Sequence, residues 1–149
     1  MGISLITGAN RGIGLAICTQ LKARGDDVVA VCRTPSPELS ALGIDIVEGI
    51  DVSDDESIQT LPSRIDNRPV DVLVNNAGRL RRDSLSQPND AEAIAQFMVN
   101  TMGPLRITRA LMPLLSSGSK VAHITSRMGS IGDNTSGGMY GYRMAKAAL

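Results

Sequence analysis

The sequence has few aromatic residues and no net charge, and both features exclude classes of partner. Phe, Trp and Tyr make up only 2% of its 149 residues and Trp is absent, so it has no aromatic platform on which nucleic-acid bases could stack. Lys and Arg number 15 and Asp and Glu number 15, so no net field attracts the chain to nucleic acid or to an anionic membrane. We therefore expect neither as a partner.

The chain also lacks the residues and segments that mark metal centres, disulfide frameworks and exported proteins. Its two cysteines, Cys18 and Cys32, are too few and too far apart for a disulfide framework or a zinc site, so we interpret both as reduced packing residues. The single histidine, His123, has no clustered ligands and is expected in the core; no metal site is predicted. There is no apolar run of membrane-spanning length and no signal-peptide pattern, which indicates a cytoplasmic protein.

Short apolar runs without polar alternation indicate a parallel sheet that is buried on both faces. They lie at 3–7, 28–32, 44–47, 70–74 and 121–125. Parallel strands need crossover connections, which are usually helices. The chain has 42% hydrophobic residues, enough for one core, so we predict a single dinucleotide-binding domain, residues 1–149, with an α/β, doubly wound, Rossmann-type fold.

Apolar residues at helical spacing predict the crossover helices. The first helix carries a stripe of Ile13, Ala16, Ile17 and Leu21. It stops at Gly25, which suits the left-handed position beyond a helix end. Ser53 and Glu56 form a capping-box pattern at another helix. A long helix is predicted at about 89–115, and a last one from near Tyr140.

A glycine-rich loop joins the first strand to the first helix. Gly8 allows a tight turn, Gly12 lets the backbone approach a pyrophosphate, and Gly14 lets the helix pack on the sheet. The helix amino terminus offers free N–H groups and positive potential to phosphates. The predicted phosphate site comprises Gly8, Asn10, Arg11, Gly12, Ile13 and Gly14. The spacing is G-x-x-x-G-x-G and not G-x-G-x-x-G, and an ordinary glycine-rich turn is the alternative.

The end of the second strand discriminates between NAD and NADP. Enzymes that prefer NAD place an acidic side chain there, and this sequence has Cys32. Arg33 follows it and Arg11 lies in the loop, so two guanidinium groups can reach a 2′-phosphate. We therefore predict NADP(H); the alternative is that both arginines are solvated surface charges. Asp51 and Val52 are predicted to contact the cofactor, with Asp51 accepting a hydrogen bond from the adenine amino group. Asp51 could equally be a residue that starts a helix.

Polar residues after the fourth strand and within the long helix are the next candidates. Asn76, Ala77 and Gly78 are predicted to tie neighbouring strands together and to contact the cofactor, whereas 79–83 is interpreted as a solvated loop. Asn100 precedes Pro104 by four positions, and a proline cannot donate to that carbonyl. The helix should therefore kink and the free carbonyl can hold a water, unless the kink serves only packing.

Taken together, these motifs resemble the short-chain dehydrogenase/reductase family. The resemblance rests on Thr7-Gly8-x-x-x-Gly12-x-Gly14, Asn75-Asn76-Ala77-Gly78, Asn100, Ser126 and Tyr142-x-x-x-Lys146. It covers the whole chain, and residues 126–131 are further similar to a branch with C-factor-like and sniffer-like carbonyl reductases. The resemblance implies NADP(H)-dependent hydride transfer to or from a small carbonyl or secondary alcohol substrate. It also implies that the Asn100 carbonyl positions a water in a proton relay.

The last helix carries the candidate acid/base residue. Tyr142 and Lys146 are four positions apart and share a helix face, while Tyr140 is rotated away. A phenol has a pKa near 10 in water, and a neighbouring cation favours the phenolate. We predict that Tyr142 exchanges the proton beside Lys146, and the resemblance implies that both contact the cofactor. Ser126 closes the fifth strand and is predicted to bind the substrate oxygen, with Ser130 as the alternative.

Other functions and the extent of the chain stay open at this point. A non-catalytic NADP-binding signalling or regulatory domain is the main alternative; the glycine spacing argues against a sugar-nucleotide epimerase. Family members continue beyond the position of Leu149 through two further strands, so we expect a fragment whose fifth strand is an exposed edge. The long helix resembles one that packs between subunits in the family, and we expect a homodimer or homotetramer at full length.

Overall fold

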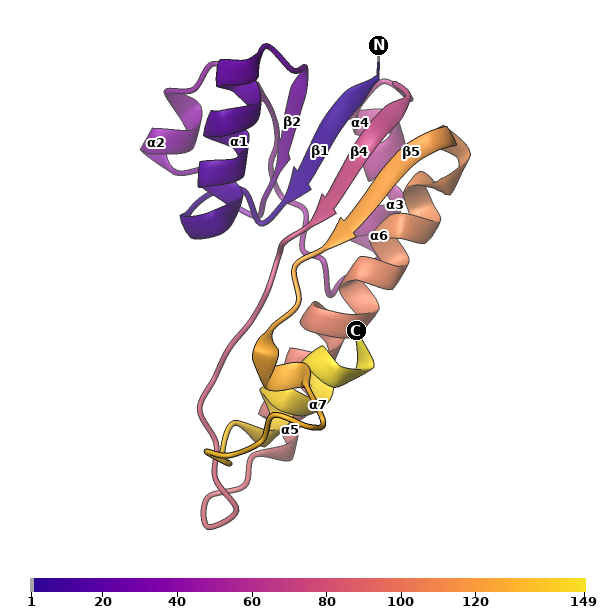
Figure 1. Ribbon diagram of the computed structural model, residues 1–149. Coiled ribbons are helices and arrows are strands. Elements are labelled where there is room, and N and C mark those ends of the chain that lie inside the picture. Colours follow the sequence, from indigo (N-terminus) through magenta and orange to yellow (C-terminus); the bar gives the residue numbers. More distant parts are fainter. Residues whose placement is uncertain (1) are drawn as a thin grey trace.

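Five parallel strands form the centre of the fold in a computed structural model that describes residues 2–149. They are β1 (Ile3–Thr7), β2 (Val28–Val31), β3 (Asp45–Val47), β4 (Val70–Asn75) and β5 (Leu115–His123). Their order across the sheet is β3-β2-β1-β4-β5, and every neighbouring pair is parallel (Figure 1). This order confirms the predicted doubly wound α/β fold.

The alternation of side chains along the strands builds a core on each face of the sheet. In β1, Ile3 and Leu5 point to one face and Ile6 to the other, and all three are buried. In β2, Val29 and Val31 join the first core, and Val28 and Ala30 join the second. Burial on both faces explains why these strands are apolar without alternation.

Helices cover the two faces of the sheet (Figure 1). On one side lie α1 (Gly12–Arg24) and α2 (Pro37–Ser40). On the other lie α3 (Asp55–Gln59), α4 (Leu61–Arg64) and α6 (Gly103–Leu111). Between β4 and α6 the chain forms α5 (Asp90–Phe97) and a π-helical turn, η1 (Met98–Met102). None of the helices within residues 2–149 combines the length and the apolar character that a membrane crossing requires.

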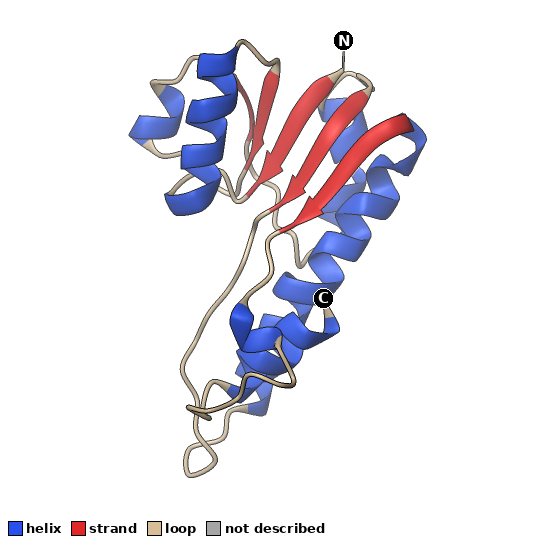
Figure 2. Ribbon diagram, in the orientation of Figure 1, coloured by secondary structure: helices blue, strands red, loops and turns tan. Residues whose placement is uncertain are grey.

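A second, helical layer lies beyond the carboxyl edge of the sheet. It contains α5, the short 3₁₀ helix η3 (Arg127–Gly129) and α7 (Tyr140–Ala148), as Figure 2 shows. Two long connections reach it, one from the end of β4 and one from the end of β5 (Figure 2). The elements α5, η1 and α6 follow one another without a break and form one long helix, called here the α5–α6 helix. The predicted catalytic residues of α7 are therefore attached to the sheet through the two connections and through this helix.

The fifth strand differs from its prediction. Residues 121–125 were expected, but β5 begins at Leu115 and ends at His123, after a short 3₁₀ turn, η2 (Met112–Leu114). Pro113 lies in that turn and has no N–H to continue a helix, so the long helix ends before Leu115. Because β5 is at the edge of the sheet, most of its side chains are exposed, including His123, which was wrongly expected in the core.

Two local predictions about helices were also wrong, the first only in part. Ile17 and Leu21 of the predicted α1 stripe pack against the core, but the buried face is centred on Gly14 and Cys18 and Ile13 is 61% exposed, because small residues let the helix approach the sheet closely. Burial raises the pKa of the Cys18 thiol to about 11, consistent with an inert packing residue. The expected capping box at Ser53 does not form: Asp54 caps α3, accepting hydrogen bonds from the N–H groups of Glu56 and Ser57.

Candidate active site

A cavity of about 930 Å³ opens at the carboxyl ends of β1, β2 and β4. Its volume falls within the range of small-molecule and cofactor sites. The predicted residues that line it are Gly8, Asn10, Arg11, Gly12, Ile13, Arg33, Asp51, Val52, Asn76, Ala77 and Gly78. Its other lining residues are Val31, Cys32, Ile50, Arg79, Leu80, Arg81 and Val99. The cavity thus lies at the point where the strand order reverses, which is where ligands bind in this class of sheet.

The glycine loop leaves one wall of the cavity free for a ligand. Gly8 and Gly12 have φ values of 65° and 56°, a left-handed conformation that favours glycine. A Cβ on Gly12 would meet nothing within 4 Å, so this backbone is open to an incoming group. A Cβ on Gly14 would lie 2.4 Å from the Gly8 carbonyl oxygen, which explains the close packing of α1 on the loop.

The amino terminus of α1 is suited to a phosphate. The first residue of a helix is commonly preceded by a side chain that accepts from the free N–H groups, as Asn89 does at α5. Arg11 holds that position at α1 and its side chain makes no capping hydrogen bond. The N–H groups of this turn are therefore available to an anion, and the residues present fit the diphosphate of a dinucleotide.

Hydrogen bonds fasten the glycine loop to the end of β4. The Asn76 amide group donates to the carbonyl oxygens of Thr7 and Gly8, at 3.0 and 3.1 Å. The Thr7 hydroxyl accepts from the main-chain N–H groups of Asn76 and Ala77. The prediction that this motif ties neighbouring strands together is confirmed, and Asn75 extends it by donating to the Thr108 hydroxyl of α6.

At the end of β2, Arg33 is available for a ligand and Asp51 lies beside it. The Arg33 side chain is 74% exposed, and its Nη1 is 3.7 Å from Asp51 Oδ2. Burial opposes ionisation of Asp51, but two hydrogen bonds from Ser53 and the charges of Arg33 and Arg79 outweigh it and lower its pKa. Asp51 is therefore a carboxylate acceptor in the cavity wall and does not cap α3, which is the role of Asp54.

The segment 79–83, interpreted from the sequence as a solvated loop, is instead held by several side chains. The buried Asn100 side chain accepts from the Arg79 N–H at 2.9 Å and donates to the Arg79 carbonyl at 2.7 Å. The Arg79 guanidinium makes two hydrogen bonds to the Glu92 carboxylate, at 2.8 and 2.6 Å. The Arg81 N–H donates to Gln96 Oε1. These partners lie on α5 and η1, which pack against the segment in the folded chain. The sequence has no local pattern that predicts these contacts.

Asn100 itself lies in the π-helical turn. The helix accommodates Pro104 by widening: the Gly103 N–H bonds to the Met98 carbonyl, five residues earlier. Such turns often occur at functional positions. The structure adds a role that the sequence did not show, because the Asn100 amide clamps the backbone of Arg79.

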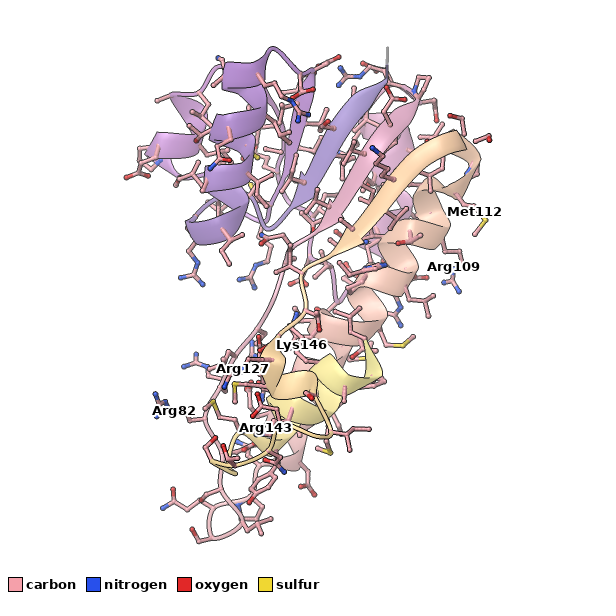
Figure 3. All side chains as sticks on the ribbon, viewed as in Figure 1. Arg82, Arg109, Met112, Arg127, Arg143 and Lys146 are labelled. Atoms are coloured by element: carbon pink, nitrogen blue, oxygen red, sulfur yellow. The ribbon has the colours of Figure 1, made fainter. Side chains whose placement is uncertain are left out.

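On α7, Tyr142 and Lys146 are neighbours, as their spacing predicted. Lys146 Nζ lies 5.9 Å from the centroid of the Tyr142 ring. The lysine is only 6% exposed, and its ammonium donates to the Ile124 carbonyl at 2.7 Å. Lys146 consequently lies where the chain leaving β5 meets α7 (Figure 3). Burial lowers its pKa below the ordinary value.

Ser126 lies on that same connection from β5, two residues after Ile124. Its hydroxyl accepts from the Met128 N–H at 3.2 Å and so caps η3, while Ser130 Oγ accepts from the Asp133 N–H. A Cβ on Gly129 of η3 would lie 2.7 Å from the Lys146 backbone, which shows how tightly η3 packs on α7. Ser126 and Lys146 are thus brought to one region, but Ser126, Tyr142 and Lys146 are not among the lining of the cavity described above.

The sheet order, the open glycine loop and the cavity at the strand reversal define a Rossmann-type α/β protein. The sequence model of the family described as short chain dehydrogenase matches residues 3–149. The chain therefore belongs to the short-chain dehydrogenase/reductase family.

Known relatives agree with this assignment. The 1-hydroxy-2-glutathionyl-2-methyl-3-butene dehydrogenase of Rhodococcus sp. (strain AD45) is 43% identical over 99% of this chain and 66% of its own length. The C-signal protein of Myxococcus xanthus is 51% identical over 54% of this chain and 51% of its own. The chain thus spans between half and two thirds of these relatives.

Solved structures share the fold over the whole chain. A carbonyl reductase from Pseudomonas aeruginosa PAO1 in complex with NADP is 33% identical, with a TM-score of 0.90, and is covered over 72% of its length. The carbonyl reductase Sniffer of D. melanogaster is 29% identical, with a TM-score of 0.89, and is covered over 71%. These neighbours support the carbonyl-reductase-like branch expected from residues 126–131, and the first of them holds the predicted cofactor.

The burial of Lys146 generates a pH-dependent prediction. Its pKa is lowered from 10.5 in the folded chain, so the unfolded chain binds this proton more tightly. The penalty for burying the charge is full below the folded-state pKa of Lys146 and decreases as pH rises from that pKa toward 10.5. The free energy of unfolding of the wild type, relative to Lys146→Met, should therefore increase over this range, by at most about 1.4 kcal/mol per pH unit.

Urea unfolding at stepped pH measures this difference. Lys120→Met is the matched control, since it removes the same charge from the exposed part of β5. A free energy of unfolding of the wild type that falls relative to that of Lys146→Met as pH rises would contradict the burial of a charged lysine.

Proposed function

We propose that this chain is a single dinucleotide-binding domain of an NADP(H)-dependent oxidoreductase that acts on a small carbonyl or secondary alcohol substrate. The observation that carries the proposal is the Lys146–Tyr142 pair, with its ammonium 5.9 Å from the ring centroid, held at the end of β5. The pair lies on the same carboxyl edge of the sheet as the cavity with the open glycine loop. A tunable proton donor and a nucleotide site on one edge suit hydride transfer coupled to proton transfer.

The cavity residues would hold the nucleotide. The open first turn of α1 and the backbone of Gly12 would receive the diphosphate, Arg33 and Arg11 the 2′-phosphate, and Asp51 the adenine amino group. When bound, the nicotinamide would supply or accept the hydride. The NADP-bound P. aeruginosa structure and the NADPH-bound carbonyl reductase from chicken fatty liver support this choice of cofactor.

The chain's own residues would handle the proton. Tyr142 would exchange it with the substrate oxygen, which Ser126 would also contact. Lys146 has three N–H donors, of which one is used by the Ile124 carbonyl, so the others are available to the nucleotide and to a water. The Asn100 side chain holds the backbone of Arg79, and its main-chain carbonyl would be the group that joins a proton relay.

The cofactor preference is tested by titration. Wild-type protein should bind NADPH more tightly than NADH, and Arg33→Ala should weaken NADPH by at least about tenfold while changing NADH little, because a charge-assisted contact to the 2′-phosphate is lost. Binding is measured by calorimetry. Arg24→Ala, at the other end of α1, is the control and should bind as the wild type does. Equal affinity of the wild type for both nucleotides would exclude the assignment.

The acid/base role is tested by separating the two tyrosines. Tyr142→Phe should reduce NADPH-dependent carbonyl reduction by a factor of about 100 or more, because the proton donor is removed. Tyr140→Phe is the matched control on the same helix and should retain activity. Activity is followed by the loss of NADPH absorbance with a panel of aldehydes and ketones. Equal activity of the two variants would exclude Tyr142.

A second candidate is a non-catalytic NADP-binding signalling domain. The M. xanthus relative named C-signal favours it. NADPH binding with no carbonyl-dependent oxidation of NADPH across the same panel would support this alternative over the first.

We also propose that the α5–α6 helix forms a contact between two copies of the chain. Leu105 and Met112 are 56% and 59% exposed and seven positions apart, so they share a helix face, and Ile94 and Phe97 extend the exposed apolar residues along α5. Met112 and Arg109 point away from the sheet (Figure 3). An exposed apolar stripe of this kind is typical of an oligomer interface.

This contact is tested by mass measurement in solution. The wild type should sediment as a dimer or tetramer, and Leu105→Asp should shift it to monomer because a charge is introduced into the apolar contact. Ile131→Asp, at a residue that is 94% exposed outside the helix, is the control and should leave the mass unchanged. A monomeric wild type would contradict the proposal.

A further inference from the structure

Helix α7 begins without a capping side chain of its own. A helix is usually preceded by an extended residue such as Ser or Asp, whose side chain accepts from the first free N–H groups. Before α7, Gly137, Gly138 and Met139 are all left-handed, with φ values of 59°, 66° and 52°, and Met139 makes no side-chain cap. The first turn of α7, which leads to Tyr142, therefore needs another partner for its N–H groups.

That partner is Asp83, which lies 57 positions earlier than Tyr140, on the connection from β4 to α5. Its Oδ1 accepts from the Tyr140 N–H at 2.5 Å, and its Oδ2 accepts from the Gly141 N–H at 2.9 Å. Its main-chain carbonyl accepts from the Met139 N–H at 3.3 Å. One residue thus receives three successive N–H groups, and its negative charge lies at the positive end of the helix.

Asp83 is itself attached to the scaffold. The Asn100 clamp on Arg79 and the bond from the Arg81 N–H to Gln96 Oε1 hold the backbone just before it. The same first turn of α7 packs against α5, where a Cβ on Gly141 would lie 2.9 Å from both the Ala93 Cα and Gln96 Nε2. The cap is therefore part of a packed junction.

The other end of α7 has separate anchors. The Thr101 hydroxyl donates to the Ala145 carbonyl at 2.7 Å, and the Lys146 ammonium donates to the Ile124 carbonyl. Tyr142 lies between these anchors and the Asp83 cap. If the cap is lost, the first turn can fray or pivot about the fixed second turn, and Tyr142 would move relative to Lys146.

We propose that Asp83 is a positioning residue that orients Tyr142 toward Lys146 by capping α7. Asp83 acts through the helix and takes no part in proton transfer. The consequence for turnover rests on the proposed function, whereas the orientation of the tyrosine does not.

The composition of the chain permits a direct test. The sequence has two tyrosines and no tryptophan, so in a Tyr140→Phe background the tyrosine band of the near-ultraviolet circular dichroism spectrum comes from Tyr142 alone. Asp83→Ala removes both acceptor oxygens, and Asp83→Asn keeps one of them. Asp133→Asn is the matched control, since it removes the same charge from the neighbouring loop, where Asp133 pairs with Arg127.

We expect the band to collapse in Asp83→Ala, to be partly restored in Asp83→Asn and to be unchanged in Asp133→Asn, with equal far-ultraviolet spectra. Carbonyl reduction should fall in kcat by on the order of tenfold to a hundredfold in Asp83→Ala, with KM for NADPH unchanged, because misplacement of a reacting group by about 1 Å costs up to this factor. Asp83→Asn should recover part of kcat.

An intact Tyr142 band in Asp83→Ala and Asp83→Asn would overturn the proposal, as would an equal loss in Asp133→Asn. If Asp83→Ala loses its far-ultraviolet signal, the decision rests on Asp83→Asn, whose band must be weaker than that of the parent. Absence of carbonyl reduction in the parent protein would count against the proposed function alone, since the band still reports the orientation of Tyr142.

Discussion

The hydrogen bonds between Thr7 and the Asn76–Ala77 segment hold the two central loops of this protein together. The Thr7 hydroxyl accepts two N–H groups and donates to the Val74 carbonyl at 3.4 Å, so its hydrogen-bonding capacity is filled. The Asn76 amide returns two bonds to the glycine loop. Because the carboxyl ends of β1 and β4 are fixed in this way, the helix terminus that faces the cavity and the chain that leaves β4 have one defined separation.

The segment 79–83 follows the Asn76–Ala77 segment and is hydrogen-bonded to the helices of the second layer. Each of its alternate residues has a specific partner: Arg79 binds Asn100 and Glu92, Arg81 binds Gln96, and Asp83 binds the start of α7. Arg79 and Arg81 also line the cavity. The same short segment therefore lines the cavity proposed for the nucleotide and also binds the helix that carries Tyr142. It links the proposed hydride-transfer site to the proposed proton donor.

The location of Lys146 shows how burial and hydrogen bonding compete at such a site. Desolvation disfavours the ammonium, and its bond to the Ile124 carbonyl partly compensates. The same bond ties α7 to the chain that leaves β5, close to Ser126. Lys146 therefore links α7 to this connection, and its ammonium also lies 5.9 Å from the centroid of the Tyr142 ring.

By itself, the sequence determined the features that depend on local spacing. The unbroken apolar strands specified the parallel sheet, the glycine positions specified the loop geometry, and the four-residue interval placed Lys146 over Tyr142. Only the tertiary structure decided the rest. Contacts between segments far apart in the chain, such as Asp83 with Gly141 or Asn100 with Arg79, leave no local pattern, and the edge position of β5, which exposes His123, follows from the strand order and not from the composition of the strand.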